Sequence, residues 1–166
     1  MTETSGTVPG HPNHKEVPQI QDRLRKGPPL LLDGATGTEL NRRGVDTGLP
    51  MWSAKALLDA PDVLRAIHRD YVLAGAEIIT ANTFRTHRRS LAAAGYAGRA
   101  NMLTKKAVEL ARGAIEDAVP GNSRGLHVAG SIAPLEDCYS PGLVPDSETL
   151  SVEHPEMAKT LADAGA

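Results

Sequence analysis

Short apolar runs alternate along the chain with segments of helical periodicity. Three runs are rich in aliphatic or β-branched side chains, which indicates strands at residues 30–32, 77–80 and 126–131. The segments between and after them carry apolar side chains at helical spacing, which predicts helices at residues 52–59, 61–75, 86–94, 99–118 and 155–164. Each strand is therefore followed by helix.

This alternation favours βαβ units with right-handed crossovers, and so an α/β fold with parallel strands. Two architectures agree with it: a complete small α/β sandwich, or the first three βα units of a TIM (β/α)₈ barrel. A whole barrel typically needs about 250 residues, whereas the chain has 166. The barrel interpretation therefore implies an incomplete barrel, with a looser segment at residues 134–153 above the strand ends.

Residues 1–27 lack this periodicity and are rich in proline, glycine, threonine and histidine. We expect them to form a disordered tail before an ordered domain at residues 28–166. His11 and His14 could together contact a metal ion. A solvated tail is the simpler interpretation, because no cysteine or carboxylate cluster accompanies the pair.

Composition excludes several classes of partner. The net charge is -2 with scattered basic residues, and aromatic residues make up 3% of the chain. Nucleic acid is therefore not expected as a partner, since both a basic footprint and stacking platforms are missing. No stretch reaches the roughly 20 apolar residues of a membrane span, so no membrane association is expected. The single cysteine, Cys138, cannot form an internal disulfide, which favours a reducing, cytoplasmic location.

Small polar residues follow all three predicted strands. Asp33 and Gly34 follow the first, Asn82 and Thr83 the second, and Ser131 ends the third. In parallel α/β folds the carboxyl ends of the strands form the ligand site. Asp33 could there pair with an ammonium group, while the amide, the hydroxyls and loop N–H groups hold a carboxylate. The pattern predicts a site for a small zwitterion.

Other interpretations of these loop residues stay open. Asp33 before Gly34 could be a turn former, and Thr36 a helix cap. Glycines 34 and 37 could cradle a phosphate, although the spacing matches neither nucleotide-binding motif. Asn82 could be an ordinary loop amide, and we expect Trp52 to be a packing residue more than a substrate platform.

Two further sets of reactive side chains could have a function, but a simpler interpretation is preferred for each. His68, Arg69 and Asp70 lie on a predicted helix away from the strand ends, so we expect a solvated helix face. Cys138 could be a metal ligand or a nucleophile, but nothing nearby in sequence completes either site. We expect it to be a spectator thiol.

Three motifs, in order, resemble one known family. They are DGATGTEL at residues 33–40, AGAEIITANTF at residues 74–84 and AGSIAP at residues 129–134. Together they are similar to the strand-end motifs of the homocysteine S-methyltransferase family. The resemblance covers residues 29–166, and it implies that residues 28–166 are the N-terminal part of a homocysteine-binding (β/α)₈ barrel.

The resemblance implies a chemistry. Family members bind zinc through cysteine thiolates, and the metal holds homocysteine as the thiolate that attacks a small methyl donor, giving methionine. Carried over by motif, Asp33 and Gly34 contact the amino-acid end of homocysteine. Asn82, Thr83 and Ser131 line the same mouth of the barrel.

The sequence also departs from the family. Cys138 matches none of the family's zinc ligands, so neither a metal ligand nor a catalytic residue is assigned. We expect the chain to stop before those ligands and to be inactive alone, with open sheet edges that lead to self-association or to a complementing chain. Two alternatives remain: a non-catalytic amino-acid-binding or regulatory module, and an unrelated α/β enzyme with a phosphorylated ligand.

Overall fold

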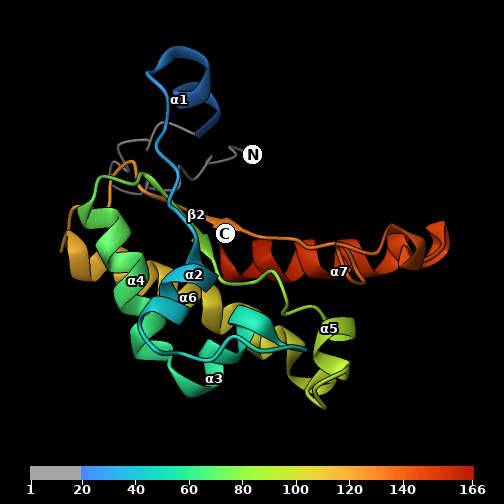
Figure 1. The fold of residues 1–166 in the computed structure, drawn as a ribbon. Coiled ribbons are helices and arrows are strands. Elements are labelled where there is room, and N and C mark those ends of the chain that lie inside the picture. The colour runs from blue at the N-terminus through green and yellow to red at the C-terminus, as the bar shows by residue number, and fades with distance from the viewer. Residues whose placement is uncertain (1–19) are drawn as a thin grey trace, which may run out of the picture.

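The computed structural model describes residues 20–166, so His11, His14 and most of the expected tail lie outside it. The end of that segment differs from the expected disordered tail, because residues 20–26 form helix α1 (Ile20–Lys26). A long-range contact holds this helix: Arg23 Nη2 donates to Glu77 Oε1 at 3.1 Å. Figure 1 shows α1 standing apart from the rest of the fold.

A small parallel sheet lies at the centre of the fold. Strand β1 (Ile78–Ala81) pairs with β2 (His127–Gly130), with Ile78 opposite His127. These strands confirm the second and third predicted ones. The first is reduced to a single parallel bridge from Leu32 to Ile78.

The expectation that the first strand is buried on both faces is wrong. Leu31 is 54% exposed and Leu32 is 56% exposed. A parallel strand is buried when other elements pack on both of its faces, and the described residues leave both leucines without this covering. The backbone still continues the sheet, since Asp33 N donates to Ile78 O at 3.0 Å.

The helices that the sequence predicts occur in the expected order, with two further ones at residues 36–42 and 141–143 that it did not predict (Figure 1). They are α2 (Thr36–Arg42), η1 (Trp52–Lys55), α3 (Ala56–Asp59), α4 (Pro61–Leu73), α5 (Arg88–Ala92), η2 (Ala97–Arg99), α6 (Ala100–Ala118), η3 (Pro141–Leu143) and α7 (Ser147–Ala164). The core forms where α4 packs on α6, with Leu64 and Ile67 of one helix and Leu103 and Ala107 of the other all fully buried. Their helical spacing produces this apolar face.

The last helix is longer than predicted. It begins at Ser147, and Pro155 lies inside it. Asp146 caps the helix, because its Oδ1 accepts a hydrogen bond from Thr149 N at 2.7 Å. This cap and the burial of Met157 and Leu161 outweigh the one backbone hydrogen bond that a proline removes.

His68 contradicts the expected solvated helix face. It is fully buried in α4, and neither ring nitrogen has a hydrogen-bond partner among the described residues. Burial lowers the pKa of His68 from 6.5 to about 4. The reason is position: residue 68 lies one helical turn from Leu64 and Val72 on the core face, whereas the side chains of Arg69 and Asp70 stay about half exposed.

The described residues thus form an α/β fold with a two-stranded parallel sheet. Within residues 20–166, no helix has the length and apolar character needed to cross a membrane.

Candidate functional site

A cavity of about 320 Å³ lies at the carboxyl ends of the strands. Four of the five sequence-predicted residues line it: Asp33, Gly34, Asn82 and Ser131. Three loops separated by roughly 50 residues in sequence therefore meet at one point, as parallel pairing of their strands requires.

Asp33 is held at the floor of this cavity by one residue of β1. Its Oδ2 accepts from Thr80 N at 2.8 Å, and its Oδ1 accepts from Thr80 Oγ1 at 2.8 Å. Burial nevertheless raises the pKa of Asp33 above its ordinary value, against the lowering effect of both bonds. A half-buried carboxylate with lone pairs to spare is stabilised by a cationic ligand, so the geometry suits an ammonium group.

Asn82 is not free to act as a simple ligand contact. Its Oδ1 accepts from Ser53 Oγ at 2.7 Å, and its Nδ2 donates to Ser53 O at 2.8 Å. The amide is buried and retains one N–H beyond these bonds. Asn82 therefore fixes η1 against the end of β1 and has one donor left for a ligand.

Thr83 differs from its expected position. It is fully buried and does not line the cavity. Its Oγ1 accepts from Ser131 N at 2.9 Å and donates to Ser131 O at 2.8 Å. Residue 83 lies just beyond β1 in a turn, where Thr83 N donates to Ala81 O at 2.7 Å. From this position Thr83 braces Ser131 instead of contacting a ligand.

Gly34 is required by a close approach. A Cβ atom at this position would lie 2.8 Å from Tyr71 Oη, and that hydroxyl donates to Ala35 O at 3.1 Å. Thr36 begins α2, and Ala35 occupies the cap position without a side-chain bond. The alternative interpretation of Thr36 as a cap is therefore wrong.

Trp52 combines packing with a place in the cavity wall. Its ring meets Phe84 edge-on at a centroid distance of 5.7 Å, and the side chain is 40% exposed. Its φ of 49° is unusual for a bulky residue, and such strained residues cluster at functional sites. Sequence reasoning favoured a packing role for Trp52 over that of a substrate platform. It missed Ser53 and Thr80, although the end of the predicted strand indicated Thr80.

The described residues do not fit a cysteine-ligated metal. Cys138 is exposed, and residues 20–166 contain no group of three or more histidine, cysteine, aspartate or glutamate side chains arranged to hold a metal ion. The cavity is lined by groups that can bind a polar ligand: one carboxylate, one amide N–H and the polar groups of Ser53 and Ser131.

Comparison with known proteins identifies one family. A sequence model described as homocysteine S-methyltransferase matches residues 30–166. Homocysteine S-methyltransferase of Escherichia coli is 37% identical over 150 residues, covering 82% of this chain and 47% of the relative. Selenocysteine methyltransferase of Astragalus bisulcatus is 31% identical over 173 aligned residues, covering 89% of this chain and 51% of the relative.

A solved structure agrees with the sequence relatives. The crystal structure of the Escherichia coli homocysteine methyltransferase in its metallated form has a TM-score of 0.78 and 34% identity, covering 91% of this chain and 55% of that chain. The resemblance read from the three motifs is confirmed. The chain spans about half the length of these two curated relatives.

Proposed function

The chain belongs to the homocysteine S-methyltransferase family, and on that premise we propose that its strand-end cavity binds the amino-acid end of homocysteine for methyl transfer to the thiol. The observation that carries the proposal is Asp33. Its carboxylate is half buried in the cavity, with a raised pKa, and its described hydrogen bonds come from Thr80. An ammonium group would supply the missing counter-charge.

The rest of the amino-acid end follows from the same geometry. The spare N–H of Asn82 and the polar groups of Ser131 lie around the cavity that Asp33 lines, so they suit the carboxylate. Gly34 keeps the loop close to Tyr71. In this proposal Thr83 contributes by positioning Ser131 and not by contact.

Of the methyl-transfer reaction, we assign only substrate binding to this chain. The family resemblance implies zinc with cysteine ligands and a small methyl donor, and residues 20–166 supply no such ligand set. We therefore assign to this chain substrate binding alone, and we expect no methionine formation by the isolated chain. A cytoplasmic location and the lack of nucleic-acid or membrane partners stay predictions from the composition.

The proposed context is the N-terminal part of a (β/α)₈ barrel. Two features of the sheet support it: exposed Leu31 and Leu32 on one side, and on the other a hollow of about 890 Å³ lined by Val128 and Ala129 of β2. Open edges of this kind take up further strands. We expect them to be covered by a complementing polypeptide or by self-association.

Isothermal titration of the purified chain with L-homocysteine tests the binding role. Asp33→Asn removes the counter-charge and should weaken binding about tenfold or more, the usual scale for one charge-assisted bond. Asp163→Asn is the matched control, because Asp163 pairs with Lys159 on the surface of α7. Equal affinity of wild type and Asp33→Asn would contradict the proposal.

The non-catalytic module is the second candidate, favoured by the missing ligand set. A methionine-formation assay with zinc and S-methylmethionine separates the two functions. Turnover by the pure chain would contradict the assignment of binding alone. Turnover only after addition of a complementing polypeptide would support the barrel context, and binding without turnover in either case would support the module.

A further inference from the structure

A row of buried threonine hydroxyls connects the strand-end cavity with α7. At the cavity, Thr83 is bonded to both backbone polar groups of Ser131. Thr83 O in turn accepts hydrogen bonds from Thr86 N at 3.1 Å and from Thr86 Oγ1 at 3.0 Å. Thr86 Oγ1 lies 2.8 Å from Thr104 Oγ1 of α6, and Thr104 Oγ1 lies 3.9 Å from Met157 Sδ of α7. The loops after β1 and β2 are therefore joined to both helices by one continuous series of polar contacts.

The hydrogen bonds of this row have one consistent direction. A hydroxyl has a single hydrogen to donate. Because the hydroxyl hydrogen of Thr86 goes to Thr83 O, Thr104 donates the bond between the two hydroxyls. The hydrogen of Thr104 is then used as well, so Met157 Sδ, a weak acceptor, lies against Thr104 without receiving it. Every hydroxyl hydrogen in the row therefore points towards the cavity loops.

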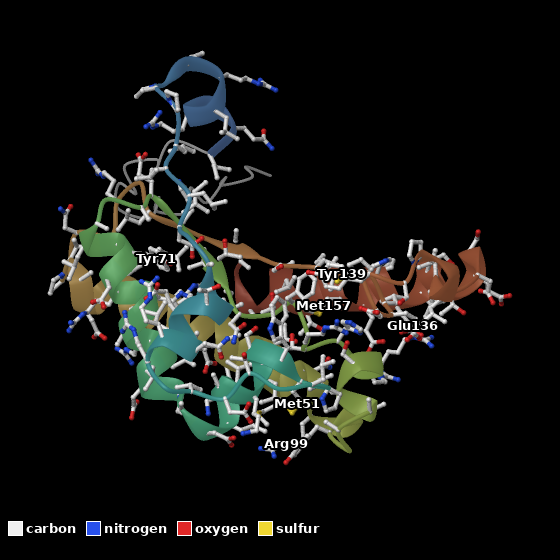
Figure 2. All side chains as sticks on the ribbon, viewed as in Figure 1. Met51, Tyr71, Arg99, Glu136, Tyr139 and Met157 are labelled. Carbon is white, nitrogen blue, oxygen red and sulfur yellow. The ribbon has the colours of Figure 1, made fainter. Side chains whose placement is uncertain are left out.

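The row is shielded from water. Thr83 and Thr86 are fully buried, Thr104 is 1% exposed and Met157 is 6% exposed. In such surroundings no water replaces a lost bond, so the group that the bond satisfied is left unpaired. Figure 2 shows Met157 on the side of α7 that faces the rest of the fold, and its sulfur contacts Thr104. Met157 therefore covers the outer end of the row.

The same stretch of α7 is held in place by α5. Two of its glutamates, at residues 153 and 156, form ion pairs with Arg89 and Arg88 of α5. These pairs are partly exposed, so each contributes little by itself. Met157 is the buried residue beside them. The covering of Thr104 thus depends on how α7 docks on the fold.

We propose that Thr86 and Thr104 are positioning residues of the strand-end cavity, which fix Ser131 through Thr83, and that Met157 makes ligand affinity depend on the docking of α7. The inference rests on the proposed function for the identity of the ligand. Thr104 has no hydrogen bond to Thr83 or Ser131 among the described residues, so its effect on the cavity passes through Thr86. α7 thereby influences the site without lining the cavity.

Amide hydrogen exchange of Ser131 tests the row without any ligand, because this N–H donates to Thr83 Oγ1. The reference is the amide of Val108, a buried residue of α6. In Thr104→Val we expect the exchange rate of Ser131 relative to Val108 to rise about three- to tenfold, the scale of one lost hydrogen bond. Thr104→Ser keeps the hydroxyl and should restore the wild-type ratio. A general loss of stability does not raise this ratio, and an unchanged ratio in Thr104→Val would overturn the inference.

Thr160→Val is the matched control, because it also removes a buried hydroxyl from the contact between α6 and α7. Thr160 Oγ1 is bonded to Glu156 O at 3.0 Å and to Asn101 Oδ1 at 3.3 Å, and neither partner belongs to the row. The variant should keep the wild-type exchange ratio. A rise as large as that in Thr104→Val would show that any loss in this contact loosens Ser131, and would overturn the inference.

Two variants of Met157 test the role of α7, and they keep the inference testable if Thr104→Val does not fold. Met157→Leu still covers Thr104, and the sulfur that it removes receives no hydrogen, so we expect the wild-type exchange ratio. Met157→Ala opens the outer end of the row to water, which competes for the hydrogen of Thr104. We expect the ratio to rise about three- to tenfold. Equal ratios in the two variants would overturn the dependence on α7.

Isothermal titration with L-homocysteine separates this inference from the proposed function. If wild type binds, Thr104→Val should weaken binding about three- to tenfold, whereas Thr160→Val should bind like wild type. Equal affinity of wild type and Thr104→Val would overturn the positioning role. If wild type fails to bind homocysteine while Thr104→Val raises the exchange ratio, the proposed function is wrong and the positioning of Ser131 by the row is supported.

Discussion

The hydroxyl of Thr83 is bonded to both backbone polar groups of Ser131, at 2.9 Å to the nitrogen and 2.8 Å to the oxygen. These residues follow β1 and end the third predicted strand, so one side chain ties together the two loops that form the cavity. The brace is fully buried at Thr83, where no water replaces a lost bond.

Thr83→Val tests this brace. The substitution keeps the shape and removes both hydrogen bonds, leaving Ser131 N and O unpaired, so we expect the free energy of unfolding to fall by about 1–3 kcal/mol. Urea denaturation measures it. Thr47→Val is the control, because the hydroxyl of Thr47 bonds Asn41 at the exposed surface, and its effect should stay within about 0.5 kcal/mol.

Gly34→Ala tests the close approach in the first loop. The added Cβ would lie 2.8 Å from Tyr71 Oη, whereas at Gly37 the nearest atom of Trp52 would be 3.5 Å away, an ordinary contact. We expect Gly34→Ala to cost about 1–3 kcal/mol and to weaken homocysteine binding, and Gly37→Ala to leave the free energy of unfolding unchanged. Urea denaturation of both variants and titration of Gly34→Ala with homocysteine measure these effects. Equal stability of the two variants would contradict the prediction.

Because His68 is buried, we expect the free energy of unfolding to fall at acid pH. Its pKa is lowered from 6.5 to about 4 by burial, so between these values the unfolded chain binds a proton that the folded chain does not. Stability is therefore complete above pH 6.5 and declines as the pH falls towards 4, by about 2 kcal/mol between pH 7 and pH 5 from this group. The measurement is urea denaturation at both pH values. His68→Leu should flatten the difference by that amount, and an unchanged difference would contradict the origin assigned to it.

Gly130→Ala tests the packing of α7 on the sheet. A Cβ at the end of β2 would lie 2.6 Å from Leu161 Cδ1, and Leu161 is buried. We expect a loss of about 1–3 kcal/mol from overpacking. In a double-mutant cycle with Leu161→Ala, the two losses should sum to more than the loss in the double variant. Simple additivity would show that the two positions do not clash.

Local apolar periodicity predicted most of the secondary structure. The predicted helices at residues 61–75 and 99–118 correspond to α4 and α6 within one or two residues. Apolar spacing within one segment decides these elements. The exception is α7, where the local rule against proline placed the start eight residues too late, because burial of Met157 and Leu161 against the core is not a local property.

The candidate site was likewise predicted only in part from local sequence. Motif order alone indicated the family and brought Asp33, Gly34, Asn82 and Ser131 to one predicted site, because the parallel strands that precede them must end at the same edge. The sequence by itself thus determined the fold class, the family and the place of the cavity. Only the tertiary structure decided that Thr83 braces Ser131, that His68 is buried, and that Leu31 and Leu32 are exposed. Those outcomes depend on contacts between segments far apart in sequence, and burial is set by the segments that cover a residue and not by its neighbours in the chain.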